Sequence, residues 1–186
     1  MTRSPLAPDS FPDLPPIAGI KLGTAASGMR YQGRDDLLLI TLAPESSVAG
    51  VFTQSDTAAA PVGWSRKIAE TGKAAAIITN AGNANAFTGS RGDNAVHDIV
   101  NNLASHLDCD AGAIMVASTG VIGETLDDGH MVAALGHLVE ARGASWPAAA
   151  KAITTTDTFS KGAVAVVPGT HVSGSVVGIA KGSGMI

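Results

Sequence analysis

The spacing of apolar residues changes at Asp93, and this change constrains the fold more than any other feature of the chain. Before Asp93, apolar residues come in short continuous runs bounded by turn-forming residues, as in strands. After it they recur at the intervals of an amphipathic helix, at Val96, Ile99, Val100, Leu103 and Leu107. Asp93 is suited to capping the first turn of that helix. Strands followed by a helix predict a mixed α/β fold.

The short runs before Asp93 predict three strands. Residues 37–42 and 48–53 are separated by Pro44-Glu45-Ser46-Ser47, so we expect a hairpin. Residues 74–79 form an apolar run that ends at an asparagine- and glycine-rich loop, which indicates a buried strand.

The second half of the chain alternates strands and helices. The predicted elements are a strand at 113–117, a helix at 126–142 ended by Gly143, a third helix that begins around Ser145-Trp146-Pro147, and strands at 162–167 and 172–179 around Pro168-Gly169. The expected fold class is α/β of the α+β type, a layered sandwich of mixed sheet and helices.

Composition favours one domain with a tail. Residues 1–16 carry repeated prolines and predict an extended segment, whereas 17–186 predict one domain. Hydrophobic residues make up 45% of the chain but aromatics only 4%, with 22 glycines, so we expect small side chains and close backbone approach in the core.

Charge and hydropathy exclude several classes of protein. The formal net charge is −4 without a basic run, which argues against nucleic-acid binding. No apolar stretch approaches the roughly 20 residues that span a bilayer, and the N-terminus lacks an apolar signal core. A soluble cytoplasmic protein is expected. The single cysteine, Cys109, cannot form an internal disulfide and is interpreted as a structural thiol.

Three short motifs carry residues suited to chemistry. Ser118-Thr119-Gly120 follows a predicted strand, and the glycine would let a backbone N–H approach a substrate. Lys181 stands between an apolar strand and a Gly-Ser-Gly loop. Residues 154–158 read Thr-Thr-Thr-Asp-Thr. Each motif also has a structural reading: a turn, a solvated cation, and a helix end that leads into a strand.

Other candidate motifs indicate no cofactor. Asn80, Asn83 and Asn85 predict a structural loop near the site without a catalytic role. The histidines, His97, His106, His130, His137 and His171, lack metal-binding spacing or an evident acidic partner in the sequence. Gly182-Ser183-Gly184 is an incomplete dinucleotide fingerprint, so no nucleotide cofactor is expected.

The final residues, 178–186, run from an apolar strand into a glycine-spaced lysine loop that looks cut, as in one half of a divided active site. Together with residues 50–53, 79–86, 117–123 and 154–158, this ending resembles the glutamate N-acetyltransferases of arginine biosynthesis, also called ornithine acetyltransferases. In that family the loop continues to an Ala-Thr bond at which the precursor cuts itself. The resemblance implies that this sequence is the α chain and that a β chain completes the fold.

The resemblance also implies roles for individual residues. The Thr119 hydroxyl and the Gly120 amide would form an oxyanion hole, and Lys181 and Thr155 would bind substrate. Thr156 is the alternative to Thr155, because the extra threonine leaves the register open. No residue of this chain is expected to be the nucleophile.

The implied activity is ping-pong transfer of an acetyl group from N2-acetylornithine to glutamate through the β chain's N-terminal threonine, with acetyl-CoA as a further possible donor. The expected assembly is an α2β2 heterotetramer. Two alternatives stay open: a related self-cleaving acyltransferase with another substrate, and a non-catalytic assembly subunit.

Overall fold

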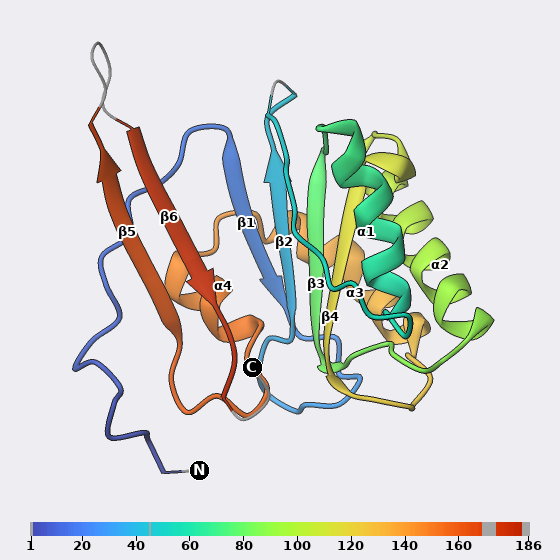
Figure 1. Ribbon diagram of the computed structural model, residues 1–186, viewed down its shortest axis with the longest axis horizontal. Coiled ribbons are helices and arrows are strands. Elements are labelled where there is room, and N and C mark those ends of the chain that lie inside the picture. The colour runs from blue at the N-terminus through green and yellow to red at the C-terminus, as the bar shows by residue number, and fades with distance from the viewer. Residues whose placement is uncertain (1, 45, 169–173, 184–186) are drawn as a thin grey trace.

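The computed structural model describes residues 2–44, 46–168 and 174–183, and its centre is a four-stranded sheet (Figure 1). The strand order is β1 (Ile20–Ala25), β2 (Leu37–Leu42), β3 (Ala76–Asn83) and β4 (Ile114–Val121). The pairs β1–β2 and β2–β3 are antiparallel, whereas β3–β4 is parallel. The carboxyl ends of β3 and β4 therefore meet at one edge of the sheet, where open α/β sheets commonly bind ligands.

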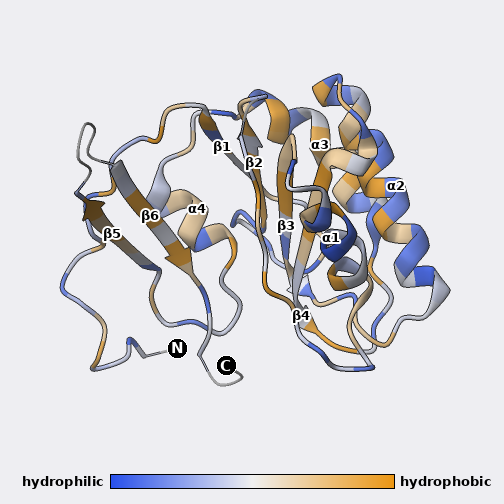
Figure 2. Cartoon of the chain, turned by 45° about the horizontal axis from the view of Figure 1, so that its top comes forward, coloured by the Kyte–Doolittle hydropathy of each residue, from blue (hydrophilic) through white to orange (hydrophobic). Residues whose placement is uncertain are grey.

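Two helices cover one face of this sheet. The helices α2 (Ser90–Leu107) and α3 (Asp128–Glu140) pack on β-strand residues that include Leu37, Ile78 and Val116. All the residues predicted for the inner face of the 126–142 helix are buried: Met131, Leu135, Leu138 and Val139. Figure 2 shows apolar stretches along β2 and β3 of the sheet they cover. No helix in the described parts of the chain is long and apolar enough to cross a membrane.

The opposite face carries the short helix α4 (Trp146–Ala152) and a separate hairpin of β5 (Lys161–Val167) and β6 (Gly174–Ala180). Ala149 and Ala152 of α4 pack on Leu22 and Leu38. The predicted start of α4 is confirmed, since Ser145 caps it by accepting from Ala148 N. In Figure 1 the hairpin stands beyond the β1 side of the sheet.

The free edge of β4 is covered by α1 (Ala60–Thr71) (Figure 1). Trp64 Nε1 donates to Ile114 O at 2.8 Å. The Ser65 hydroxyl donates to Val116 O at 2.7 Å and accepts from Val116 N at 2.8 Å. The outward backbone groups of Ile114 and Val116 thus have side-chain partners, and this part of the edge is closed to further strand pairing.

Valine side chains of the β5–β6 hairpin are exposed. Val164, Val166, Val167 and Val176 expose between 41% and 69% of their surface. Because each strand carries such residues, this hairpin leaves apolar surface open to solvent.

The structure confirms the mixed α/β class and overturns one predicted hairpin. Residues 48–53 form no strand; the only pairing nearby in the described chain is an isolated bridge between Ser47 and Lys73. The reason is that β1 and β3 already occupy both hydrogen-bonding edges of β2. The sequence reading also missed β1 and α1.

Several predicted boundaries move. β3 extends through Asn83, so Asn80 and Asn83 of the expected asparagine loop lie in the strand, and Asn85 lies beyond it. β4 runs on through Thr119 and Gly120 to Val121. α2 begins at Ser90, and its N-cap is Gly89, so Asp93 lies inside the first turn and does not cap it. The 3-10 turn η1 (Ala111–Ala113) precedes β4.

The proline-rich tail contacts the folded domain. Residues 2–16 contain no helix or strand, but the tail contacts the fold: Trp146 Nε1 donates to Pro15 O at 3.0 Å. Gly169, His171, the start of the predicted strand at Val172 and the last loop residues, 184–186, lie outside the described residues.

Candidate active site

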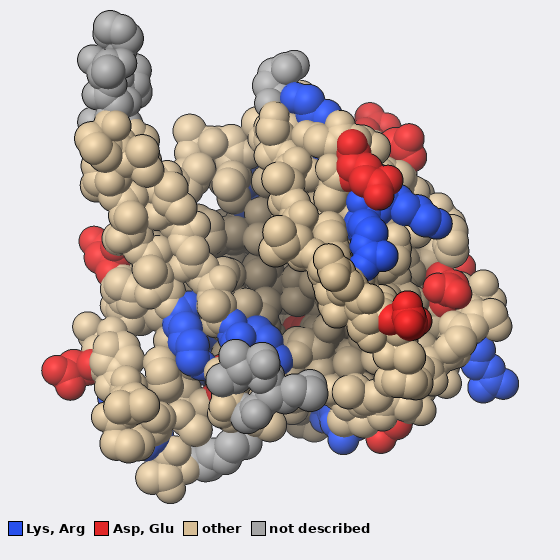
Figure 3. Space-filling view, in the orientation of Figure 1, with Lys and Arg blue, Asp and Glu red and all other residues tan. Residues whose placement is uncertain are grey.

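A cavity of about 420 Å³ lies at the carboxyl ends of β3 and β4. Segments far apart in the sequence line it, and the lining includes all five residues predicted as site residues: Thr119, Gly120, Thr155, Thr156 and Lys181. The remaining lining residues are Arg30, Tyr31, Gly82, Val121 and Ser183. In Figure 3 basic side chains gather below the hollow between the hairpin and the main sheet.

Thr119 and Lys181 are in direct contact. Lys181 follows β6, and its Nζ lies 2.5 Å from Thr119 Oγ1 on β4. An ammonium group can only donate, so the threonine oxygen accepts and its own hydroxyl proton is left for another acceptor. Accepting from a cation also makes a hydroxyl a better donor. Thr119 can therefore donate a strengthened hydrogen bond within the cavity.

Gly120 is required by the neighbouring strand. Its φ is +138°, and a Cβ built on it would lie 2.2 Å from Gly82 C and 2.5 Å from Asn83 N. These are backbone atoms of β3, which cannot move aside as a flexible side chain can. From the sequence, we expected a glycine here so that a backbone N–H could approach a substrate. The structure shows that the close packing of β4 on β3 already requires a residue without a Cβ at this position.

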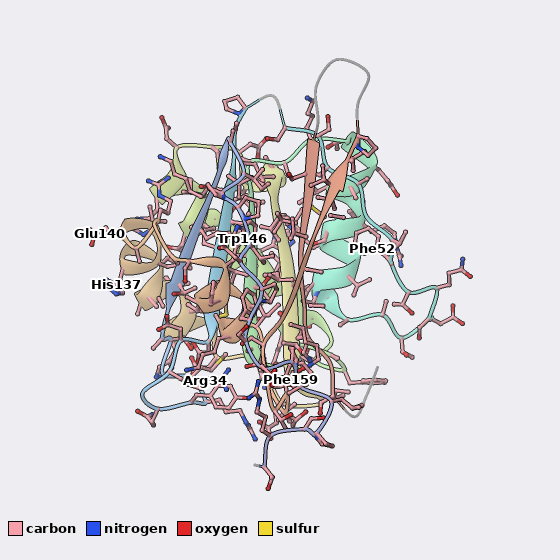
Figure 4. All side chains as sticks on the ribbon, turned by 90° about the vertical axis from the view of Figure 1, so that its left-hand side faces the viewer. Arg34, Phe52, His137, Glu140, Trp146 and Phe159 are labelled. Atoms are coloured by element: carbon pink, nitrogen blue, oxygen red, sulfur yellow. The ribbon has the colours of Figure 1, made fainter. Side chains whose placement is uncertain are left out.

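Within the threonine run, Thr154 is a buried structural residue, whereas Thr155 and Thr156 line the cavity. Thr154 is buried, its hydroxyl donates to Lys151 O at 2.7 Å, and its carbonyl accepts from Arg34 Nη2 at 2.7 Å. The Arg34 guanidinium lies over the ring of Tyr31, 4.2 Å from its centroid. Thr155 and Thr156 line the cavity instead. Figure 4 shows Arg34 and Phe159, from the two segments that meet here, at the same end of the molecule.

Asp157 is the residue that sequence reasoning missed. Its side chain is 1% exposed, and its Oδ1 accepts from Lys161 Nζ at 2.5 Å and from Gly182 N at 2.7 Å. Its Oδ2 accepts from Thr155 N at 3.4 Å. One carboxylate thus ties the Thr155 segment to the residue after Lys181. The sequence signal that could have pointed to Asp157 is its place as the single acidic residue within a run of threonines.

Ionised Asp157 is stabilised by these donors. Burial alone would raise the pKa of this carboxyl, but the hydrogen bonds from Lys161, Gly182 N and Thr155 N together hold the pKa below its ordinary value. A folded-state pKa below the unfolded one contributes stability that is fully present above the unfolded pKa and is lost as pH falls through the folded pKa.

We therefore expect Asp157→Asn to destabilise the protein by about 2 kcal/mol at neutral pH, because the charged acceptor is lost. The difference from wild type should begin to shrink as pH falls below about 4, where Asp157 of the unfolded chain becomes protonated, and should vanish as pH falls through the lower pKa of the folded state. Thermal unfolding from about pH 7 to about pH 3 measures this. Asp98→Asn, at an exposed position of α2, is the matched control. A deficit in Asp157→Asn that does not change with pH contradicts the assignment.

The side-chain amides of the three asparagines hydrogen-bond to backbone carbonyls, as expected of structural loop residues. Asn80 Nδ2 donates to Asn83 O at 2.9 Å, Asn83 Nδ2 donates to Glu124 O at 3.1 Å, and Asn85 Nδ2 donates to Gly92 O at 2.9 Å. They hold the loops around the cavity in place, and none of them lines it.

Cys109 and the described histidines lie outside the cavity. Burial first, then the neighbouring Asp110 and Asp108, raise the pKa of the Cys109 thiol, which disfavours the reactive thiolate. His130 does have an acidic partner: its Nδ1 lies 2.8 Å from Asp127 Oδ2, at an exposed position. Among the described residues, no cluster of histidine, cysteine or acidic side chains could hold a metal ion.

The structure is a layered α/β fold whose cavity gathers a threonine hydroxyl, a lysine ammonium and two further threonines. The profile of the ArgJ family matches residues 21–186. This chain belongs to the ArgJ family.

Individual relatives agree with this membership. The chain is 47% identical over 184 residues to the arginine biosynthesis bifunctional protein ArgJ of Bradyrhizobium diazoefficiens, and 45% identical over 184 residues to that of Agrobacterium fabrum. Each match covers 98% of this chain but 45% of the relative. The chain thus spans about half the length of the curated relatives it matches.

Solved structures share the fold. The structure of an ornithine acetyltransferase complexed with ornithine, from Mycobacterium tuberculosis, matches with a TM-score of 0.84 at 34% identity, covering 91% of both chains. The arginine biosynthesis bifunctional protein argJ of Bacillus halodurans matches with a TM-score of 0.81 at 32% identity, covering 91% of this chain and 89% of the other.

Proposed function

We propose that this chain supplies the oxyanion-stabilising half of an acetyltransferase that moves an acetyl group from N2-acetylornithine to glutamate. The observation that carries the proposal is the contact between Lys181 Nζ and Thr119 Oγ1 inside a cavity that Thr155 and Thr156 also line. A hydroxyl polarised by an ammonium is a suitable donor to the oxygen of a carbonyl under attack.

The reaction proceeds in two steps. The hydroxyl oxygen of an N-terminal threonine on the partner chain attacks the acetyl carbonyl, and its proton passes to that threonine's own α-amino group. The C–N bond of N-acetylornithine then breaks, ornithine leaves with the proton, and the acetyl group stays as an ester. In the second step the amino group of glutamate attacks this ester, and the threonine hydroxyl is regenerated.

Thr119 and Gly120 act on the oxygen that becomes negative in both steps. The Thr119 hydroxyl donates to it, and the Gly120 amide is the second donor. Lys181 and Thr155 hold the amino-acid end of each substrate, with Thr156 as the neighbouring alternative. An ammonium suits a carboxylate as a compact point charge.

The partner in this proposal is a second chain, formed when the precursor cleaves itself. The exposed valines of the β5–β6 hairpin support an obligate interface, because such surface is normally covered in a stable assembly. The assembly would be an α2β2 heterotetramer. Expressed alone, this chain should aggregate and lack activity.

The word bifunctional in the relatives' names favours a second activity, and we assign it to acetyl-CoA as an alternative acetyl donor. No bound cofactor takes part. We expect the enzyme in the cytoplasm.

The rival candidates are a self-cleaving acyltransferase for another amino-acid-derived acyl group and a non-catalytic assembly subunit. An exchange assay separates them. The protein expressed from its full-length coding sequence should move labelled acetyl from N-acetylornithine to glutamate. Transfer only from another acyl donor would favour the first rival, and no transfer by a correctly assembled protein would favour the second.

Lys181→Met should raise KM for both amino-acid substrates about tenfold, because a charge-assisted contact to the shared carboxylate is lost in ground and transition states alike. It should also lower kcat, because the Thr119 hydroxyl loses the ammonium that polarises it. Initial-rate kinetics of each half-reaction measure the effect, and Lys67→Met on α1 is the control. If KM is unaltered while the unfolding temperature falls, Lys181 is a structural residue.

A further inference from the structure

The charged residues that line the cavity in the described chain are both basic: Arg30 and Lys181. The nearest described acid on the Lys181 side, Asp157, is buried and already accepts three hydrogen bonds. Lys181 is engaged with Thr119. A cavity with two separate cations fits a ligand with two carboxylates better than a ligand with one.

The aliphatic part of the Arg30 side chain packs on the backbone beside the cavity that Arg30 lines. A Cβ built on Gly82 would lie 3.1 Å from Arg30 Cβ and 3.4 Å from Arg30 Cδ, so this side chain runs closely over the β3 backbone. Gly82 is also the residue on which Gly120 packs. The stem of Arg30 therefore lies over the part of β3 that pairs with Gly120, and Arg30 lines the same cavity as Thr119 and Gly120.

Glu124 is the counter-ion of Arg30. Arg30 Nη1 lies 3.0 Å from Glu124 Oε2, and the two side chains are 45% and 58% exposed. The backbone of Glu124 is fixed, because its carbonyl accepts from Asn83 Nδ2 at 3.1 Å. A pair this exposed contributes little to stability, so its partners can exchange at small cost.

The proposed reaction brings two amino acids with opposite side-chain charges to this one cavity. Both carry an α-carboxylate, the group assigned to Lys181. Only the acceptor, glutamate, adds a second carboxylate, whereas the ornithine side chain ends in an ammonium. An arginine without a counter-ion would attract the side-chain carboxylate of glutamate and repel the side-chain ammonium of ornithine.

We propose that Arg30 binds the side-chain carboxylate of the acetyl acceptor, and that Glu124 neutralises Arg30 while the cationic donor occupies the cavity. This inference rests on the proposed function. Arg30 is a specificity-determining residue in it, because a planar guanidinium can bind a carboxylate through two hydrogen bonds. The exchange of Arg30 between Glu124 and glutamate lets one site serve substrates of opposite charge.

The test uses the assembled protein from the full-length coding sequence, in each half-reaction. Arg30→Met should raise KM for glutamate about tenfold and leave KM for N-acetylornithine unchanged. It should also reduce the preference for glutamate over glutamine as acceptor about tenfold, since glutamine lacks the charge. Glu124→Gln should have the opposite pattern, with a higher KM for N-acetylornithine and a KM for glutamate that is equal or lower.

Arg66→Met is the matched control, because Arg66 lies on α1 and donates to Thr53 O outside this cavity. Equal changes for both substrates in Arg30→Met, or an intact preference for glutamate over glutamine, overturn the inference while the proposed function stands. A wild-type protein that exchanges no acetyl between these two amino acids overturns the proposed function itself.

Discussion

Thr119→Ala lowers kcat for acetyl transfer by roughly two to three orders of magnitude in our account, the usual cost of removing one oxyanion donor. The hydroxyl is the atom that the Lys181 ammonium polarises, so its loss removes a donor that acts mainly when charge develops on the carbonyl oxygen. KM should change much less. Initial rates of both half-reactions give kcat and KM separately.

Thr119→Ser is the matched control for this change. Serine keeps the hydroxyl and loses only a methyl group, so we expect it to retain most of the activity. A Thr119→Ala protein that is correctly folded and keeps kcat within a few-fold of wild type would show that Thr119 does not contact the reacting oxygen.

Gly120→Ala should have the largest effect on stability. The new Cβ would meet the β3 backbone at 2.2 Å, and the φ of +138° is one that residues with a Cβ rarely adopt. Overpacking and an unfavourable φ each cost about 1–3 kcal/mol, so the sum of about 2–6 kcal/mol reaches the lower end of the roughly 5–15 kcal/mol that stabilises a typical domain. We expect little folded protein, measured as soluble yield and unfolding temperature.

Gly143→Ala is the control for this prediction, because a Cβ at Gly143 meets nothing within 4 Å and its φ is not positive. It should fold like wild type. If Gly120→Ala unfolds at the wild-type temperature, the close approach of β4 to β3 is not what requires the glycine.

The local spacing of apolar residues correctly predicted those helices and strands that bury one face against the core. The helix face with Met131 and Leu135, the strand at 37–42 and the helix start at Ser145 follow from spacing and capping alone. The hairpin at 48–53 failed because strand pairing is decided by competing partners. An apolar run such as 48–53 does not reveal that β1 and β3 already flank β2.

The same limit applies to the site. Thr119, Gly120, Thr155, Thr156 and Lys181 were found through motifs, and the fold brings all of them to one cavity. Their neighbours Arg30 and Tyr31 come from the loop between β1 and β2, and β1 itself was not predicted. Asp157 gains its role from Gly182, which is distant in sequence. Contacts of that kind depend on tertiary structure and leave no local signal.

The most direct test of the account is the intact mass of each chain after the assembled protein is mixed with N-acetylornithine in the absence of glutamate. We predict that the partner chain begins with threonine and gains the mass of one acetyl group, that this chain stays unmodified, and that added glutamate removes the acetyl group. An acetyl group on this chain, or rapid exchange with neither chain acetylated, would contradict the claim that this chain stabilises a reaction whose nucleophile lies on its partner.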